Sequence, residues 1–346
     1  MSIALDIGAF RMKSLRREGE RLVARGSRCA HSVLPDNTAA RNALDRAQLQ
    51  YATCEESLLL FGDSAEDFAR LFQSPCLSLL TAGHIPHDDP PARQVLATLV
   101  EAALPEPQTP GEICCLTLPG KRDSAEATDR ELEFFSRVVK LRGYEPIVLG
   151  AGMAAILAEL VDCGFTGIGI DFGAATTEVS LAHRGIELAR CVIPRGGNWI
   201  DAQLAEQNNE YAFDANGNRY LDTESARCWK EDSARSLNNP DDEREAYLVE
   251  LYSQIIAEVL DEAASTFAAN PGVCDVPQPV DIVCTGGMAS IGGFSNVFER
   301  FSQDGRFPVD IGRVRVCAES DYTVARGCLI CAELESETRS TTRQAA

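Results

Sequence analysis

The chain has 346 residues, of which 45% are hydrophobic and 24% are charged. This composition is typical of a soluble globular protein long enough for two domains. A formal net charge of −20 argues against a nucleic-acid backbone as a partner. No apolar run reaches the roughly 18 residues of a membrane-spanning helix, so we expect no direct membrane insertion. The first residues do not resemble an export signal, which favours a cytoplasmic protein.

Cysteine, histidine and lysine usage bounds the chemistry further. Thirteen cysteines without an export signal indicate reduced thiols buried in the core. The CxxC of Cys328 and Cys331 lacks the second pair that a zinc site would need. Only four of the 32 basic residues are lysines, so a lysine at a motif position is a stronger signal than usual. The four histidines show no metal or catalytic spacing and are expected at the surface: His31, His84, His87 and His183.

The first elements in chain order are an apolar strand and a hairpin. The strand carries Asp6 and Gly8 in an Asp-x-Gly arrangement. Short apolar runs separated by two-residue turns predict antiparallel strands. The predicted segments are a strand over 3–9, a strand over 13–17, a turn at 18–19 and a strand over 21–25.

The remainder of the first half has a weaker pattern and then a clear one. Residues 26–60 are polar and mixed, and Pro-rich loops are expected at 86–91 and 105–110. Apolar residues at helical spacing predict a helix over 125–141. A strand over 146–149 and a helix over 153–161 follow.

The second half repeats this order of elements. Its first strand carries Asp171 and Gly173, again as Asp-x-Gly. A polar insertion over 206–220 has a turn at Asn216-Gly217, and the Ser/Thr/Arg-rich tail after Glu337 is expected to be disordered. The predicted segments are strands over 168–174, 177–182 and 186–193, a helix over 245–267, a strand over 280–284 and a helix over 293–301.

Asp6 and Asp171 therefore lie at equivalent places in two copies of one unit, about half a chain apart. Three antiparallel strands followed by alternating helix and strand predict an α/β fold with two mixed sheets. An Asp-x-Gly turn after a buried strand offers backbone N–H groups to a phosphate, and its carboxylate can hold a hydrated divalent metal. Such turns are common singly, so the symmetric pair is what predicts phosphate binding.

The motifs resemble those of the actin-like ATPase superfamily, which includes actin, MreB, FtsA and PilM, and they are closest to MreB-type prokaryotic actins. The segment Asp6–Lys13 is similar to the first phosphate loop, and Asp171–Glu178, read DFGAATTE, to the DxGGGTTE of MreB. Residues 285–287 (Thr-Gly-Gly) resemble the adenosine motif. Residues 193–201, the Arg-x-x-Lys-Glu of 227–231 and the segment 318–327 are similar to further family segments.

The resemblance implies a duplicated ribonuclease H-like fold whose two domains face each other across a nucleotide cleft. Domain I would cover 1–163 plus 320–340, with a variable insertion at about 26–65. Domain II would cover 164–319, with a variable insertion at about 205–245. ATP or ADP with Mg²⁺ would be the cofactor, and Asp6 and Asp171 would be catalytic and hold the metal through water. The implied nucleotide-binding residues are Gly8, Lys13, Gly173, Thr176, Thr177, Gly197, Arg227, Lys230, Glu231, Gly286, Gly287 and Met288.

Departures from the family pattern affect hydrolysis. The first loop has Ala9 and Phe10 where small or hydroxylated residues are usual, and alanines replace two glycines of the second loop, which is tolerable only at negative φ. The position of the usual water-orienting Gln or Glu is Ala151. Losing that group costs orders of magnitude in phosphoryl transfer, so we expect slow hydrolysis. The alternative is that this alignment slips by a helical turn.

Three functions remain open from the sequence. The first is a cytoskeletal actin that binds ATP and Mg²⁺ and polymerises with itself. The second is a non-polymerising, nucleotide-dependent scaffold that binds a protein partner, as PilM and FtsA do. The third is a structural pseudo-ATPase. Lys13 could also be an ordinary exposed strand residue, and Lys230 with Glu231 an exposed helix pair.

Overall fold

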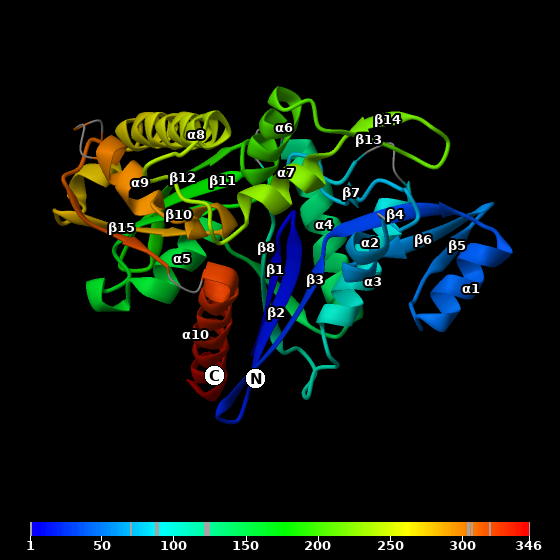
Figure 1. The fold of residues 1–346 in the computed structure, drawn as a ribbon. Coiled ribbons are helices and arrows are strands. Elements are labelled where there is room, and N and C mark those ends of the chain that lie inside the picture. The colour runs from blue at the N-terminus through cyan, green and yellow to red at the C-terminus, as the bar shows by residue number, and fades with distance from the viewer. Residues whose placement is uncertain are drawn as a thin grey trace.

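The computed structural model describes residues 2–69, 71–86, 90–120, 125–302, 305, 307–317 and 320–345. Two five-stranded mixed sheets lie at its centre (Figure 1). The first, in the order β3-β2-β1-β8-β9, contains β1 (Ser2–Ile7), β2 (Arg11–Glu18), β3 (Arg21–Arg28), β8 (Ile113–Thr117) and β9 (Glu145–Val148). The second, in the order β12-β11-β10-β15-β16, contains β10 (Gly167–Phe172), β11 (Thr177–His183), β12 (Ile186–Ile193), β15 (Val280–Thr285) and β16 (Ile311–Val316).

The two sheets share one topology. In each, the first strand pairs antiparallel with the second and parallel with the fourth, as β1 does with β2 and β8 and β10 does with β11 and β15. The central strands are buried on both faces, which explains their nearly continuous apolar runs. The predicted duplicated α/β fold is therefore confirmed.

Two helices fill the space between the sheets. Helix α5 (Ala151–Glu159) packs on the second sheet, and α10 (Thr323–Ala345) packs on the first. Small residues make this close approach possible, because a Cβ on Gly327 would lie 1.9 Å from the carbonyl oxygen of Ala154. Likewise, a Cβ on Gly169 would lie 2.0 Å from the carbonyl oxygen of Gly152.

Other helices cover the outer faces. Helices α3 (Pro90–Ala103) and α4 (Ala125–Leu141) cover the first sheet. The second sheet is covered by α6 (Gly197–Gln207), α8 (Glu243–Ala268) and α9 (Phe294–Ser302). Helix α4 has the predicted bounds, and α8 begins two residues before the predicted start. The apolar face of each amphipathic helix supplies the core on which its sheet rests.

An insertion after β3 forms a small body of its own, on the right of Figure 1. Its sheet, in the order β5-β6-β4-β7, contains β4 (Ala30–Pro35), β5 (Ala52–Cys54), β6 (Ser57–Phe61) and β7 (Leu77–Ser78). Helices α1 (Thr38–Arg46) and α2 (Asp63–Ala69) pack on it around a separate apolar cluster. The polar composition of 26–60 thus conceals regular structure, because a body this small buries few of its side chains.

A second insertion follows α6. It consists of the hairpin of β13 (Tyr211–Phe213) and β14 (Arg219–Leu221) and of α7 (Thr223–Lys230). Gly217 has a φ of 82°, so the predicted Asn216-Gly217 turn is confirmed. The 3₁₀ helices are η1 (Val161–Cys163), η2 (Pro271–Asp275), η3 (Gly287–Ser290) and η4 (Ser320–Tyr322). We keep the two-domain division at 163 and 164 as a proposal.

Three expectations from the sequence need correction. The tail after Glu337 is not disordered, because α10 continues to Ala345 as a regular helix. His31 is buried in β4 of the insertion, with 3% of its surface exposed, whereas His84 is half-buried beside Glu131 and His87 lies outside the described residues. Most cysteines are buried or half-buried and all twelve whose side chains are described are free, but Cys54 and Cys228 are exposed.

Candidate functional site

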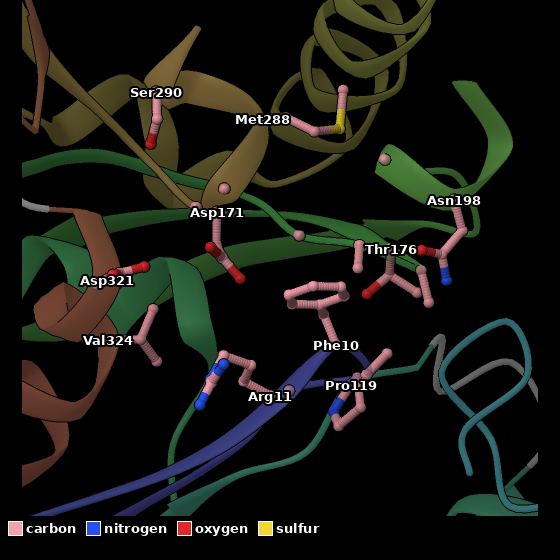
Figure 2. Close-up of a pocket in the computed structure, with 18 of the residues that line it drawn as sticks. Phe10, Arg11, Pro119, Asp171, Thr176, Asn198, Met288, Ser290, Asp321 and Val324 are labelled. Atoms are coloured by element: carbon pink, nitrogen blue, oxygen red, sulfur yellow. The ribbon is translucent and has the colours of Figure 1, made fainter. Parts of the chain in front are cut away.

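A cleft of about 1010 Å³ opens between the two halves of the molecule. Both Asp-x-Gly turns line it, together with residues of α6, α7 and η3. Figure 2 shows the side chains of Asp171, Phe10 and Arg11 directed into this one space. The predicted site residues that line the cleft are Asp6, Gly8, Lys13, Ala151, Asp171, Gly173, Thr176, Gly197, Arg227, Lys230, Glu231, Gly286, Gly287 and Met288. The topology therefore brings together residues spread over most of the chain.

Thr177 is the predicted site residue that the structure places away from the cleft. Its side chain is fully buried, and its hydroxyl donates to the carbonyl oxygen of Arg195 at 3.0 Å. Thr177 is the first residue of β11 and does not line the cleft. Thr176 immediately precedes that strand and lines the cleft (Figure 2).

Two carboxylates from opposite sheets approach each other in the cleft. Asp6 accepts a hydrogen bond from the hydroxyl of Thr117 at 2.8 Å. Burial raises the pKa of Asp6, although Lys13 and Thr117 oppose the shift. Burial, with repulsion from Asp6 and Glu178, raises the pKa of Asp171 to about 7, against the attraction of Lys13. Two carboxyl groups that disfavour each other's charge are stabilised by a cation between them.

This donor set fits a hydrated magnesium ion. In the described residues, no group of three or more His, Cys, Asp or Glu side chains could hold a metal by itself. Mg²⁺ usually keeps several waters and is held by one or two carboxylates plus phosphate oxygens. Asp6 and Asp171 would supply those carboxylates, and the ion would neutralise phosphate charge.

The two Asp-x-Gly turns are built from close backbone contacts. A Cβ on Gly8 would lie 2.6 Å from the carbonyl oxygen of Arg11, so only glycine allows this first turn to close. In the second turn the N–H of Gly173 donates to Thr176 O at 3.1 Å. The alanines at 174 and 175 are not among the positive-φ residues of the described chain, so the condition for replacing glycine holds.

The N-terminus of α6 is fastened to the second turn. The N–H groups of Gly197 and Asn198 donate to the carbonyl oxygens of Gly173 at 3.0 Å and Ala174 at 2.8 Å. Gly286, which directly follows β15, also lies against the end of β10. Its φ is 93°, and a Cβ at this position would lie 2.3 Å from Phe172 O. The predicted Gly-Gly motifs thus serve as points where backbone meets backbone at the cleft wall.

The far end of the cleft contains a buried ion pair that the sequence did not single out. Lys230 Nζ lies 2.6 Å from Asp201 Oδ1, and both side chains are less than a tenth exposed. Lys230 also donates to Gly197 O at 3.3 Å. Burial raises the pKa of Asp201 to about 6, with Lys230 opposing the shift. The rarity of lysine pointed to Lys230, whereas Asp201 appeared only as the end of a motif.

Glu178 supplies a carboxylate at the start of α5. Its Oε1 accepts from the N–H of Gly152 at 3.1 Å, and its Oε2 accepts from Arg190 at 2.5 Å. Burial raises the pKa of Glu178, which Arg190 opposes. Ala151 lines the cleft at the first position of the same helix. Helix α5 thus lacks its own polar group there, and the nearest carboxylate comes from β11.

A family model described as volactin matches residues 1–332. The chain belongs to the volactin family. No curated protein sequence matches this volactin-family chain.

Solved structures share the fold of this volactin-family protein. It is similar to the MamK double helical filament, with 17% identity, a TM-score of 0.67, and 96% of this chain and 99% of that chain covered. It is also similar to MreB 5 of Spiroplasma citri bound to AMPPNP, with 15% identity, a TM-score of 0.68, and 99% and 98% coverage. The ethanolamine utilization protein EutJ of Carboxydothermus hydrogenoformans has 16% identity, a TM-score of 0.53, and 95% and 89% coverage. The predicted actin-like fold, shared with the MamK and MreB 5 structures, is therefore confirmed.

Among the described helices of the volactin-family chain, none combines the length and apolarity needed to cross a membrane.

Proposed function

We propose that this protein binds ATP or ADP with Mg²⁺ in the cleft and assembles with itself into filaments. The observation that carries the nucleotide proposal is the pairing of Asp6 and Asp171 across two phosphate turns. Burial, together with repulsion from Asp6 and Glu178, raises the pKa of Asp171 to about 7, and a cation beside this carboxyl group would favour its ionised form. A bound Mg²⁺ would be held by Asp6 and Asp171 through water and would supply positive charge beside the phosphates.

We further propose that hydrolysis is slow. Ala151 offers no side-chain group to orient a water. Glu178, the nearest carboxylate to the start of α5, is already engaged by Arg190 and by the N–H of Gly152. Positioning supplies most of the rate in phosphoryl transfer, so the cleft favours holding a nucleotide over cleaving it.

Self-assembly is proposed from the likeness to filament-forming folds. The MamK structure with which this chain aligns over 96% of its length is a double helical filament. The actin-like frame and the proposed nucleotide cleft are both compatible with a polymer whose contacts depend on the bound nucleotide. A protein partner would be needed for any attachment to a membrane.

Nucleotide binding is tested by titrating fluorescent ATP and ADP analogues with Mg²⁺ present or removed by EDTA. Wild-type protein should bind only with Mg²⁺, and Asp171→Ala should abolish binding. Asp162→Ala is the control, because Asp162 pairs with Arg315 at 2.9 Å and does not line the cleft. Unchanged binding by Asp171→Ala would mean that the second turn does not hold the metal. GTP analogues in the same assay decide the base preference.

Polymerisation is tested by sedimentation and negative-stain imaging with ATP, with ADP and without nucleotide. Nucleotide-dependent pelleting and visible filaments are the expected result. A monomer that persists at tens of micromolar under all three conditions would exclude the filament and favour a scaffold of the PilM or FtsA kind.

A further inference from the structure

Phe10 is a bulky residue in the turn that should approach phosphate most closely. Its backbone is fixed to the end of β3, since Phe10 O accepts from Cys29 N–H at 2.8 Å and from Arg28 Nη1 at 3.4 Å. Figure 2 shows its ring projecting into the cleft. The ring therefore extends the first phosphate turn toward the opposite half of the molecule.

Two guanidinium groups lie over this ring, one from each side of the cleft. The Arg28 guanidinium carbon lies 3.6 Å from the ring centroid, and that of Arg227 lies 4.9 Å from it. Arg28 ends β3, whereas Arg227 belongs to α7. Cations within about 6 Å of an aromatic centroid are attracted by the ring's quadrupole, so Phe10 is held from both halves.

Two glutamates complete what we call the Phe10 clamp, made of Phe10, Arg28, Glu66, Glu224 and Arg227. Glu66 of α2 pairs with Arg28 at 2.8 Å and also with Arg227. Glu224 of α7 pairs with Arg227 and lies 3.6 Å from Arg28. The arginine side chains are only 8% and 11% exposed, so these pairs are little screened by solvent.

The clamp can open without leaving either of its arginines unpaired. If the halves separate, Arg28 keeps Glu66 on one side and Arg227 keeps Glu224 on the other. Only the two crossed pairs and the Arg227–Phe10 contact are lost. Separation therefore avoids the large penalty of an unpaired buried charge, while closure adds contacts that include the phosphate turn itself.

We propose that Phe10 is a positioning residue that ties the shape of the first phosphate turn to closure of the cleft. In the closed state both guanidinium groups fix the ring, and the turn presents its N–H groups to phosphate. In the open state the ring keeps only Arg28, and the turn relaxes and releases the ligand. This inference rests on the proposed nucleotide binding, and the second experiment below separates the two.

The first experiment measures release of a fluorescent ADP analogue, chased by unlabelled ADP with Mg²⁺ present. Phe10→Leu keeps apolar bulk but removes the ring, and release should become about tenfold faster. Phe10→Tyr keeps an aromatic face, so its release rate should return most of the way to that of wild type. Phe213→Leu is the matched control, because Phe213 is 60% exposed on the β13–β14 hairpin. Release from Phe10→Leu within about twofold of wild type would overturn the proposal.

The second experiment uses hydrogen exchange on the nucleotide-free protein, so it does not depend on ligand binding. Phe10→Leu should raise exchange both in the turn, residues 8–12, and in α7 across the cleft. A purely local role would raise exchange in the turn alone, which would overturn the proposal. If wild type binds no nucleotide but α7 responds, the proposed function fails and the clamp stands.

Discussion

Replacing Asp171 by asparagine should stabilise the nucleotide-free protein while it destroys the proposed metal site. The pKa of Asp171 is raised from 3.8 to about 7, first by burial and then by the charges of Asp6 and Glu178. A carboxyl group whose pKa is raised by folding contributes stability below about pH 4, and that contribution is lost as the pH rises through about 7. Above that pH its ionised form opposes folding.

The magnitude follows from the size of the shift. A difference of about three pKa units corresponds to about 4 kcal/mol at pH 8, where the group is ionised in both states. At pH 5 the folded protein keeps the proton and the unfolded chain has lost it, so the difference falls to about 2 kcal/mol. Asparagine is neutral at both pH values, so Asp171→Asn should gain stability by these amounts as upper limits.

The assay is urea unfolding of wild type and Asp171→Asn, followed by circular dichroism at pH 8 and pH 5 without nucleotide or divalent metal. The variant should unfold at higher urea, and the gap should be smaller at pH 5. Asp162→Asn is a control of opposite sign, because Arg315 lowers the pKa of Asp162 and the variant loses that pair. Equal or lower stability of Asp171→Asn at pH 8 would refute the reasoning.

Three further predictions follow from the cleft and its supports. Lys230→Met should cost about 3–5 kcal/mol of unfolding free energy, because Asp201 is left buried without its cation. Adding Asp201→Asn should recover part of that free energy. An unchanged urea midpoint for Lys230→Met would contradict the prediction. Ala151→Glu should raise phosphate release from ATP by about tenfold or more, and unchanged turnover would show that another step limits hydrolysis. Gly327→Ala should cost about 1–3 kcal/mol or more, because the added Cβ lies 1.9 Å from Ala154 O; a thermal midpoint equal to wild type would mean that α5 and α10 separate easily.

Much of the fold could be predicted because its signals are local and repeated. Period-two strands and turn residues mark β1–β3 and β10–β12, and a 3.6-residue period marks α4 and α8. The insertion that includes β4–β7 and the end of α10 were missed because neither shows a clear period along the chain. The strands of the insertion are short and mix polar with apolar residues, and the last residues of α10 are mostly polar.

The candidate site divides in a similar way. Asp6, Asp171 and the glycine turns are recognisable because backbone geometry restricts which residues can stand there. Asp201 and Glu178 carry no such restriction, and their importance comes from what they face: Lys230 in one case and the N-terminus of α5 in the other. A periodic sequence pattern does not predict which distant residue a side chain will contact.

The sequence by itself determined the duplicated frame and the Asp-x-Gly pair, since both depend on residue type and spacing along the chain. The tertiary structure alone decided which threonine lines the cleft, which carboxylates have a raised pKa, and that the ring of Phe10 contacts both Arg28 and Arg227. Those features depend on distances in space, on desolvation, and on how two halves built from separate chain segments lie opposite each other. In the sequence Phe10 is a departure from the family pattern of the turn. In the folded protein it is the residue of that turn whose ring contacts Arg227 from the opposite half.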